Sequence, residues 1–247
     1  MFTPKTQKIK DLTNKFPGRI KELELLFYQP TNVYIDFANV VKWQDKLGWH
    51  LSTKRLKHFF DSFDTIKSTK LYAGTLTSEQ RSIDAINEFK NQGYDLHTKP
   101  VKTLKLSIDV SSIPSNSPDI LKDFIRKPLL QQFKLETIEL LNKELQDLNN
   151  QGILGLEDLK CNFDVEIGRD MLLDYEKNQV GTFVLWSGDS DFYDPIFQLL
   201  RDGKRVYLFA TTRRVASELN DLRSGGLHIF DIQKIRDFIC WPREINP

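Results

Sequence analysis

The sequence predicts an α/β fold: a three-layer α/β/α sandwich with a mostly parallel central sheet, a helical insertion and an N-terminal helical extension. From residue 32 onward, short apolar runs alternate with amphipathic segments of helix length. The apolar runs are continuous enough for strands that are covered on both faces. Strands that alternate with helices form βαβ units, whose right-handed crossovers place helices on both sides of the sheet.

The first half of this pattern contains three expected strands and two expected helices. The run NVYIDF predicts a buried strand over residues 32–37, and residues 53–66 form an amphipathic pattern that starts near a Ser/Thr cap. A second strand is expected over residues 68–76, followed by a helix over residues 78–93 that ends at a glycine. Residues 94–101 predict a third strand, which is weaker because of its polar content.

The second half contains the clearest strand signal of the chain, GTFVLWSG at residues 181–188. A helix is expected before it, over residues 162–179. After it, strands and helices continue to alternate. The expected strands are residues 204–211 and 227–232, and the expected helices are residues 193–203, 214–225 and 233–241.

Two segments fall outside this alternation. Residues 1–31 predict a basic, helical extension ahead of a domain that spans residues 32–247. Residues 106–160 interrupt the domain with a loop and a long amphipathic helix over residues 129–152. This insertion is interpreted as an elaborated crossover, with a lid, a substrate platform or a homodimer arm as alternatives.

Composition excludes several classes of protein. A chain of 247 residues with 40% hydrophobic residues is large enough for one full-sized core. Its formal charge of +1 excludes a polycationic binder, so any contact with nucleic acid must come from local patches. Two cysteines without a CxxC pair indicate a reducing compartment. The N-terminus lacks the apolar core of a signal peptide and no run is long enough to span a bilayer, so we expect a cytoplasmic protein.

The segment FVLWSGDSDFYDPI raises the question of function because it crowds three aspartates directly after a strand. Ligands of open parallel sheets sit outside the carboxyl ends of the strands. Asp36 lies near the end of the first strand, Asp189 and Asp191 follow the strand at 181–188, and Asp164 begins a helix with Asp170 about two turns later. These carboxylates are therefore expected at one edge of the sheet.

Converging carboxylates without matching His or Cys are the ligand set of a hard divalent cation, Mg²⁺ or Mn²⁺. The four histidines show no zinc-ligand spacing with one another or with the cysteines. A carboxylate-bound Mg²⁺ can lower the pKa of a bound water and accept phosphate oxygens. The pattern therefore predicts metal-assisted hydrolysis of a phosphodiester.

Each acid also has a purely structural interpretation. Asp164 can be a helix cap, and Asp189 and Asp191 can belong to a turn rich in cap-forming residues. Asp170 can be an exposed helical residue. Asp36 is the hardest to explain in this way, because burying an unpaired carboxylate within an apolar strand is costly.

Three segments, VYIDFANV, KCNFDVEIGRDML and LWSGDSDFYDPI, resemble in this order the NYN family of PIN-like ribonucleases, in its LabA/DUF88-like branch. The resemblance covers about residues 32–235, with residues 106–160 as additional material. It implies a PIN-like sandwich and metal-dependent cleavage of RNA. The helix with Ser217 and Leu219 also matches the family pattern.

The resemblance implies roles for individual residues. It assigns Mg²⁺ or Mn²⁺ binding to Asp36, Asp164, Asp189 and Asp191, with Asp170 as a further ligand. Asn39 is expected to orient a water or the scissile phosphate, and Ser187 or Ser190 to bond a ligating carboxylate. The predicted catalytic residues are Asp36, Asn39, Asp164, Asp189 and Asp191.

Candidates for contact with a nucleic-acid backbone are Arg213, Arg214, Lys42 and Lys102, with ordinary solvated charge as the favoured interpretation of each. Trp43 and Trp49 are candidates for base stacking, with packing as the favoured use. The sequence departs from the family at Lys160, which lies four rather than three residues before Asp164. It also has RSGG where the family often has an Ala-Asp pair.

Two other functions compete with a nuclease. A haloacid-dehalogenase-like phosphatase needs a second aspartate two residues after its nucleophile, whereas Asp36 is followed by Phe37 and Ala38. A non-catalytic RNA-binding or interaction module is the stronger alternative. Its difficulty is that an anionic pocket without a metal repels phosphate.

Overall fold

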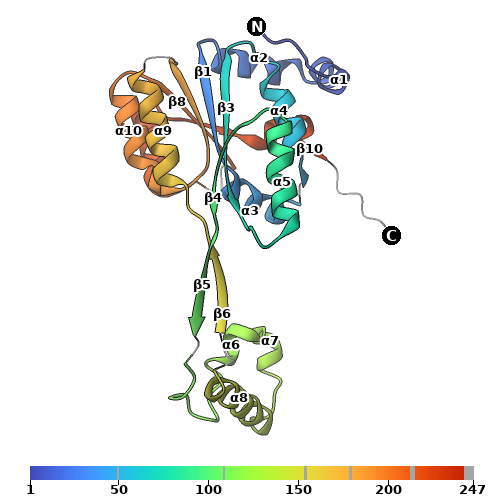
Figure 1. Cartoon of the computed structure of the whole chain (residues 1–247), viewed down its shortest axis with the longest axis vertical. Helices are drawn as coiled ribbons and strands as arrows, with labels where there is room; N and C mark the ends of the chain where they lie inside the picture. Colours follow the sequence, from blue (N-terminus) through green and yellow to red (C-terminus); the bar gives the residue numbers. More distant parts are fainter. Residues whose placement is uncertain (49, 108, 153–154, 178–179, 212–214, 242–247) are drawn as a thin grey trace. The chain divides into compact units, whose positions relative to one another are not determined.

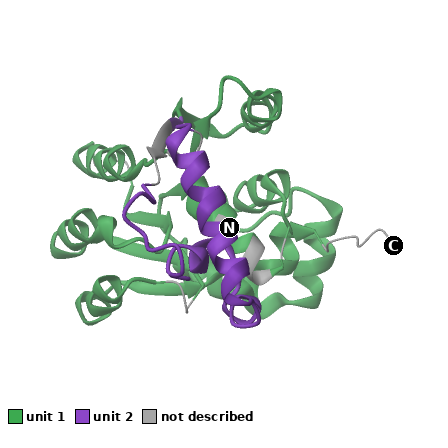
Figure 2. Ribbon diagram, turned by 90° about the horizontal axis from the view of Figure 1, so that it is seen from below, with its two compact units in different colours: residues 1–100, 161–247 green, residues 101–160 purple. Residues whose placement is uncertain are grey.

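The computed structural model describes the chain except for residues 49, 108, 153–154, 178–179, 212–214 and 242–247. The chain forms two compact units, which Figure 2 colours separately. Unit 1 comprises Met1–Pro100 and Cys161–Pro247, and unit 2 comprises Val101–Lys160. Within the described residues, no helix has both the length and the apolar character needed to cross a membrane. The cytoplasmic location stays a prediction.

Unit 1 is built on a sheet of six parallel strands, which confirms the predicted fold class (Figure 1). The strand order is β4-β3-β1-β7-β8-β9. The strands are β1 (Thr31–Asp36), β3 (Ile66–Thr75), β4 (Asp95–Pro100), β7 (Thr182–Trp186), β8 (Arg205–Ala210) and β9 (His228–Asp231). Every residue of the two central strands, β1 and β7, is buried, which accounts for their continuous apolar character.

Helices cover both faces of this sheet, with α9 and α10 on one side and α4 and α5 on the other (Figure 1). In unit 1, the described helices after β1 are α3 (Phe37–Leu47), α4 (Thr53–Phe60), α5 (Gln80–Asn91), α9 (Asp164–Glu176), α10 (Tyr193–Arg201), α11 (Ser217–Asp221) and α12 (Arg236–Ile239). Among the described residues, the short 3-10 helices η1 (Ser190–Phe192), η3 (Leu222–Gly225) and η4 (Ile232–Ile235) adjoin α10, α11 and α12, respectively. On the α4 side, Phe60 meets Trp186 edge-on with ring centroids 6.0 Å apart. Such aromatic packing holds the helices on the sheet.

Helix α3 was not predicted from the sequence, which assigned no element between the first strand and residue 53. Asp36 is both the last residue of β1 and the N-cap of α3, because its side chain accepts a hydrogen bond from the Asn39 backbone. The helix ends at Gly48, whose φ of 64° lies in the left-handed region that favours glycine. The strand thus passes into the helix without a connecting turn.

The C-terminal segment differs from the predicted helix over residues 233–241. Its residues divide among η4, α12 and a short strand, β10 (Cys240–Trp241). That strand pairs in antiparallel fashion with β2 (His50–Leu51), which follows α3. Backbone hydrogen bonds to another part of the chain therefore override the helical pattern at this end.

The N-terminal segment is helical, as expected, and it packs on the core of unit 1. Helix α1 (Gln7–Lys15) begins at Thr6, whose side chain caps the Ile9 backbone, and α2 (Pro17–Leu26) begins with a proline. Four apolar side chains join the core, namely Ile9, Ile20, Leu23 and Phe27. The Phe27 ring also stacks on Phe209 of β8, with centroids 6.0 Å apart.

The described residues of unit 2 form an antiparallel pair of strands and three helices. The strands are β5 (Lys102–Ser107) and β6 (Gly155–Lys160), and the helices are α6 (Leu121–Phe124), α7 (Lys127–Leu130) and α8 (Leu135–Asn150). The helix predicted over residues 129–152 is therefore divided between α7 and α8. Buried Asn142 of α8 donates to the backbone oxygens of Ser115 and Ser117, which fastens the preceding loop to the helix. The homodimer predicted through this helix stays a prediction.

Candidate metal centre

The carboxyl ends of β1 and β7 place Asp36 and Ser187 side by side. The two strands are parallel neighbours, and Ile35 pairs with Trp186. The next residue of each strand is therefore Asp36 on β1 and Ser187 after β7. Both residues are buried, with Ser187 completely covered and Asp36 exposed by 7%.

Ser187 connects three predicted site residues. Its hydroxyl donates to the Asp36 carboxylate at 3.4 Å. The hydroxyl oxygen accepts from the Asn39 side-chain amide at 2.9 Å and from the Asp189 backbone at 3.4 Å. A buried hydroxyl with these partners fixes how Asp36 and Asn39 are oriented.

Asp189 and Asp191 lie in the turn between β7 and α10. The Asp189 side chain caps the short helix η1 by accepting a hydrogen bond from the Asp191 backbone at 3.4 Å. Part of the local crowding of aspartates is therefore cap chemistry. Asp194, which the sequence also places in this segment, lies in the first turn of α10.

Asp164 approaches the same region from α9. It is the first residue of that helix, and the N-cap position belongs to Phe163, so Asp164 does not act as the cap itself. Its backbone N–H donates to the Asn162 side-chain oxygen at 2.7 Å, which satisfies a backbone donor at the start of the helix. A carboxylate in a first helical turn is stabilised by the positive end of the helix dipole.

These elements bring carboxylates together at the carboxyl edge of the sheet. One carboxylate oxygen from each of Asp164, Asp189 and Asp191 lies within 4.8 Å of the other two. Asp36 is outside this group of three but is joined to it through Ser187 and Asp189. We refer to Asp36, Asp164, Asp189 and Asp191 as the acidic cluster. Among the side chains that the structure describes, no Lys, Arg or His forms an ion pair with any member of the cluster.

Burial and the charges of neighbouring carboxylates raise the pKa of two members of the cluster, Asp164 and Asp36. The pKa of Asp164 rises to about 6, chiefly because of burial and then because of the charges of Asp189 and Asp36, although a bond from Asn162 opposes the change. Burial also raises the pKa of Asp36, against hydrogen bonds from Asn39 and Ser187. A divalent cation would relieve both effects, because it supplies the missing positive charge. The oxygen-only donor set fits Mg²⁺ or Mn²⁺.

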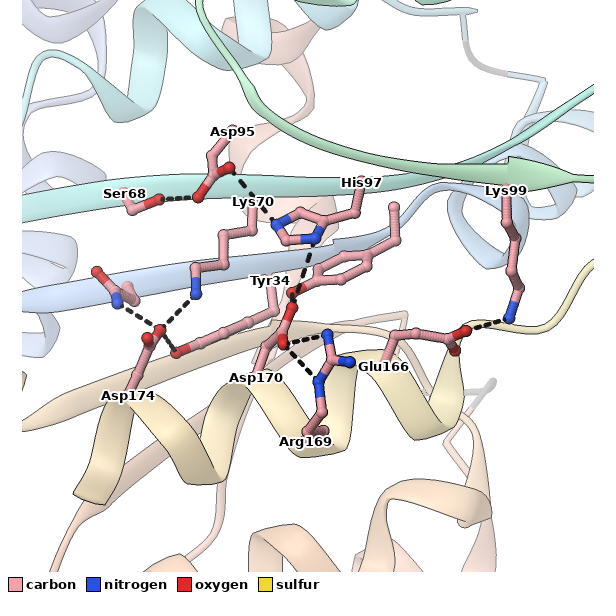
Figure 3. Close-up of polar contacts among 12 residues, drawn as sticks. Tyr34, Ser68, Lys70, Asp95, His97, Lys99, Glu166, Arg169, Asp170 and Asp174 are labelled. Atoms are coloured by element: carbon pink, nitrogen blue, oxygen red, sulfur yellow. Dashed lines mark hydrogen bonds and ion pairs between the residues drawn. The ribbon is translucent and has the colours of Figure 1, made fainter. Parts of the chain in front are cut away.

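Asp170 does not join the acidic cluster. It lies six residues after Asp164 on α9, about 1.7 turns along the helix, so the two side chains leave it in different directions. Its carboxylate accepts from the Tyr72 hydroxyl at 2.8 Å and from the Arg169 guanidinium at 2.8 and 3.0 Å. His97 Nδ1 lies 3.5 Å from the same Asp170 carboxylate (Figure 3). The structure thus gives Asp170 a place in a separate polar network.

This network fastens α9 to the sheet, and the sequence analysis missed it. Asp174 of α9 accepts from Asn32, Tyr34 and Lys70 at 2.8, 2.6 and 2.7 Å. Glu166, at the other end of the helix, pairs with Lys99 of β4 at 2.6 Å (Figure 3). Glu166, Asp170 and Asp174 are spaced by four residues and so follow one side of the helix.

The sheet contributes a matching polar face. Residues two apart on a strand point to the same side, and the partners follow this spacing on β1 (Asn32 and Tyr34), β3 (Lys70 and Tyr72) and β4 (His97 and Lys99). These spacings, two residues on the strands and four on α9, were the signal in the sequence from which this polar interface could have been predicted. The polar interface sets the position of α9 and therefore that of Asp164 relative to Asp36.

The ionisation states within the network follow from its partners. Although burial disfavours the charged carboxylate, hydrogen bonds from Lys70, Tyr34 and Asn32 lower the pKa of Asp174. Burial, together with the hydrogen bonds to Asp174 and Asp170, raises the pKa of Tyr34 and Tyr72. The carboxylate is therefore charged and both tyrosines are neutral donors at neutral pH.

The remaining predicted residues lie elsewhere or outside the described structure. Ser190 starts η1, and Lys102 is an exposed residue at the start of β5 in unit 2. Arg213 and Arg214 lie outside the described residues, as does Trp49, and Lys42 lies in α3 with a side chain that is not described. Trp43 is exposed by only 4% and packs in the core, which is the use favoured from the sequence.

These features define a class of protein: an α/β protein whose parallel sheet carries an acidic site at its carboxyl edge. Residues 129–225 match the model of the NYN domain, a family of PIN-like nucleases, which confirms the resemblance inferred from the sequence. The matched segment includes Asp164, Asp189 and Asp191, whereas Asp36 precedes it.

Two further comparisons add context. No curated protein matches the chain. Among solved structures, a protein of unknown function from Vibrio parahaemolyticus is similar to this chain, with 15% sequence identity and a TM-score of 0.49. The similarity covers 85% of this chain and 95% of the other.

Proposed function

We propose that the chain is a metal-dependent ribonuclease that hydrolyses phosphodiester bonds in single-stranded RNA. The observation that carries this proposal is the acidic cluster: carboxylates from β1, α9 and the turn after β7 meet at one edge of the sheet, and no described side chain neutralises them. Acids held together without a counter-charge raise the free energy of the folded protein. A cation and its phosphate ligand offset that cost.

The proposed roles follow from the contacts of each residue. Asp164, Asp189 and Asp191 would hold Mg²⁺ or Mn²⁺ directly, and Asp36 would do so directly or through a water. When bound, the cation supplies positive charge to the phosphate and lowers the pKa of a coordinated water. Ser187 keeps the Asp36 carboxylate in place, and Asn39, held by Ser187, offers amide hydrogen bonds without adding charge.

The pKa of Asp164 sets the pH at which this chemistry can operate. A carboxyl group with a pKa of about 6 is largely protonated at pH 5 and must lose its proton before it can bind a cation. We therefore expect metal affinity and cleavage to rise with pH between about 5 and 7.

A cleavage assay with a matched control tests the proposal. Wild-type protein should cleave labelled single-stranded RNA in Mn²⁺ and not in EDTA. The cleavage rate of Asp189→Asn should fall by more than about 100-fold, which is the upper end expected for a residue that only hydrogen-bonds to a metal ligand. Asp194→Asn removes the same charge five residues along, outside the acidic cluster, and should cleave like wild type. Cleavage by Asp189→Asn at the wild-type rate would mean contamination and would defeat the proposal.

The same assay separates the alternatives. Tight RNA binding with no cleavage in either Mg²⁺ or Mn²⁺ would indicate a non-catalytic binding module. Release of phosphate from p-nitrophenyl phosphate, with the RNA left intact, would indicate a phosphatase. A parallel single-stranded DNA substrate shows whether the sugar matters, because only RNA offers the 2′-hydroxyl.

A further inference from the structure

A pocket of unit 1 has the opposite chemical character to the acidic cluster. It encloses about 470 Å³ and is bordered by α1, α4, α12 and β10. Gly48, at the end of α3, also borders it, whereas Asp36 caps the beginning of the same helix. Eleven residues of α-helix separate these two positions by about 16 Å. The pocket is therefore distinct from the acidic cluster.

Positive charge dominates the pocket wall. Four lining residues are cations, namely Lys8, Lys15, Arg55 and Arg236, and the single lining acid is Asp237. That acid lies 3.3 Å from Arg19 and 3.6 Å from Arg236. Within the described part of the chain, neither Lys8 nor Lys15 forms an ion pair. The pocket thus retains several positive charges that an anion could neutralise.

Arg55 contributes a positive charge that is largely buried. It is exposed by 9%, and its guanidinium donates to the backbone oxygens of Cys240 and Asp237. None of the ion pairs among the described residues includes it. Carbonyl oxygens orient the guanidinium but leave its net charge in place, so a bound anion would stabilise this arrangement.

Aromatic surface lies beside these cations. The Trp241 side chain is 51% exposed, and both Lys8 and Arg55 lie within about 5 Å of its ring centroid, at 5.1 and 4.9 Å. Phe16 forms another part of the wall, with Lys15 5.3 Å from its centroid. Flat rings alternating with cations bind a base and its phosphate together. A simple anion would leave the aromatic part of the wall uncovered.

We propose that this pocket binds a nucleotide unit, with its phosphate among Lys8, Lys15 and Arg236 and its base against Trp241 and Phe16. The volume is within the range of small-molecule sites. The unit can come from a free nucleotide or from an RNA strand, because both present the same base and phosphate. The proposal does not rest on the ribonuclease activity, and it concerns a site at the far end of α3 from the acidic cluster.

Binding measurements on the full chain in EDTA test the proposal without any metal-dependent step. The probes are uridine monophosphate, inorganic phosphate and a short labelled single-stranded RNA. Calorimetry measures the binding of the two small molecules, and fluorescence anisotropy measures that of the RNA. Lys8→Ala/Lys15→Ala should weaken the binding of the monophosphate and the RNA by about tenfold or more, and should lower the salt dependence of RNA binding. Trp241→Leu should weaken binding of the nucleotide while leaving that of inorganic phosphate unchanged.

A matched control is available on the same two N-terminal helices. Lys10→Ala/Lys21→Ala removes two exposed lysines from α1 and α2 that do not line the pocket, and it should bind every probe like wild type. RNA that competes with the monophosphate but binds far more tightly would identify a strand as the source, and equal affinities would identify a free nucleotide. Wild-type affinity in Lys8→Ala/Lys15→Ala, or inorganic phosphate binding as tightly as the monophosphate, would overturn the proposal.

Discussion

Replacing Asp164 with asparagine should stabilise the metal-free protein and weaken its response to metal. The difference between a pKa of about 6 and the ordinary value of 3.8 corresponds to about 3 kcal/mol at 1.36 kcal/mol per pH unit. That figure is an upper bound, because the side chain is partly exposed and solvent screens its interactions. After this discount, and after the loss of about 0.5 kcal/mol of helix-dipole stabilisation, we expect a gain of about 1 kcal/mol at pH 7.5.

Thermal unfolding measures this effect directly. A gain of about 1 kcal/mol corresponds to a rise in Tm of about 2–4 °C for a domain of this size. Saturating Mn²⁺, at about 100 times its Kd, should stabilise the wild type by about 2.7 kcal/mol and the Asp164→Asn variant by clearly less. The variant should therefore be the more stable protein in EDTA and the less stable one in Mn²⁺.

The pH dependence of the difference provides an internal check. Because the pKa of Asp164 is raised in the folded state, its ionisation costs stability fully above about pH 6, and the cost disappears as the pH falls toward the ordinary value of 3.8. The advantage of Asp164→Asn should therefore shrink between pH 7.5 and pH 5. A variant that is less stable than wild type in EDTA at pH 7.5, or one with an unchanged Mn²⁺ response, would refute the reasoning.

Other predictions concern the network behind the cluster. Lys70→Met leaves the Asp174 carboxylate buried without its cation and should cost about 2–3 kcal/mol in urea unfolding; a fully stable variant would contradict a structural ion pair. Because the folded pKa of Asp174 is lowered, its stabilising effect is lost as the pH falls below about 4, so Asp174→Asn should flatten the acid limb of the stability curve. Ser187→Ala should reduce the cleavage rate by about 10–100-fold and the free energy of unfolding by about 1 kcal/mol, because Asn39 and Asp36 lose the hydroxyl that orients them. Full activity of this variant would remove Ser187 from the proposed mechanism.

The strands were predictable because apolar runs record burial on both faces. The strand at residues 181–188 corresponds to β7, and the first strand agrees with β1 within one residue at each end. Helix α3 was missed because its cap is Asp36 itself, so no turn residues separate strand from helix. The helix expected to continue through Trp241 ends earlier because Cys240 and Trp241 pair with a distant strand, a tertiary effect that local pattern does not carry.

The candidate site was predictable to the extent that it depends on strand ends. Parallel strands bring their carboxyl ends to one edge, so the sequence alone predicts that Asp36 and Asp189 lie at the same edge of the sheet. Asp170 could not be placed in this way, since its direction depends on how α9 rotates against the sheet. That rotation is held by contacts to the sheet, from Tyr72 to Asp170 and from Lys70 to Asp174, and the pattern of the helix alone does not identify these partners.

The polar interface between α9 and the sheet also limits how this protein can change. An apolar interface tolerates exchanges of similar volume one residue at a time. Here Glu166, Asp170 and Asp174 of α9 are each matched to particular donors. In the pair of Asp174 with Lys70, altering either partner alone leaves a charge away from water. Sequence drift beneath this helix should therefore proceed through coupled double exchanges, and a pairwise mutational scan should show its strongest epistasis there rather than among the aromatic residues.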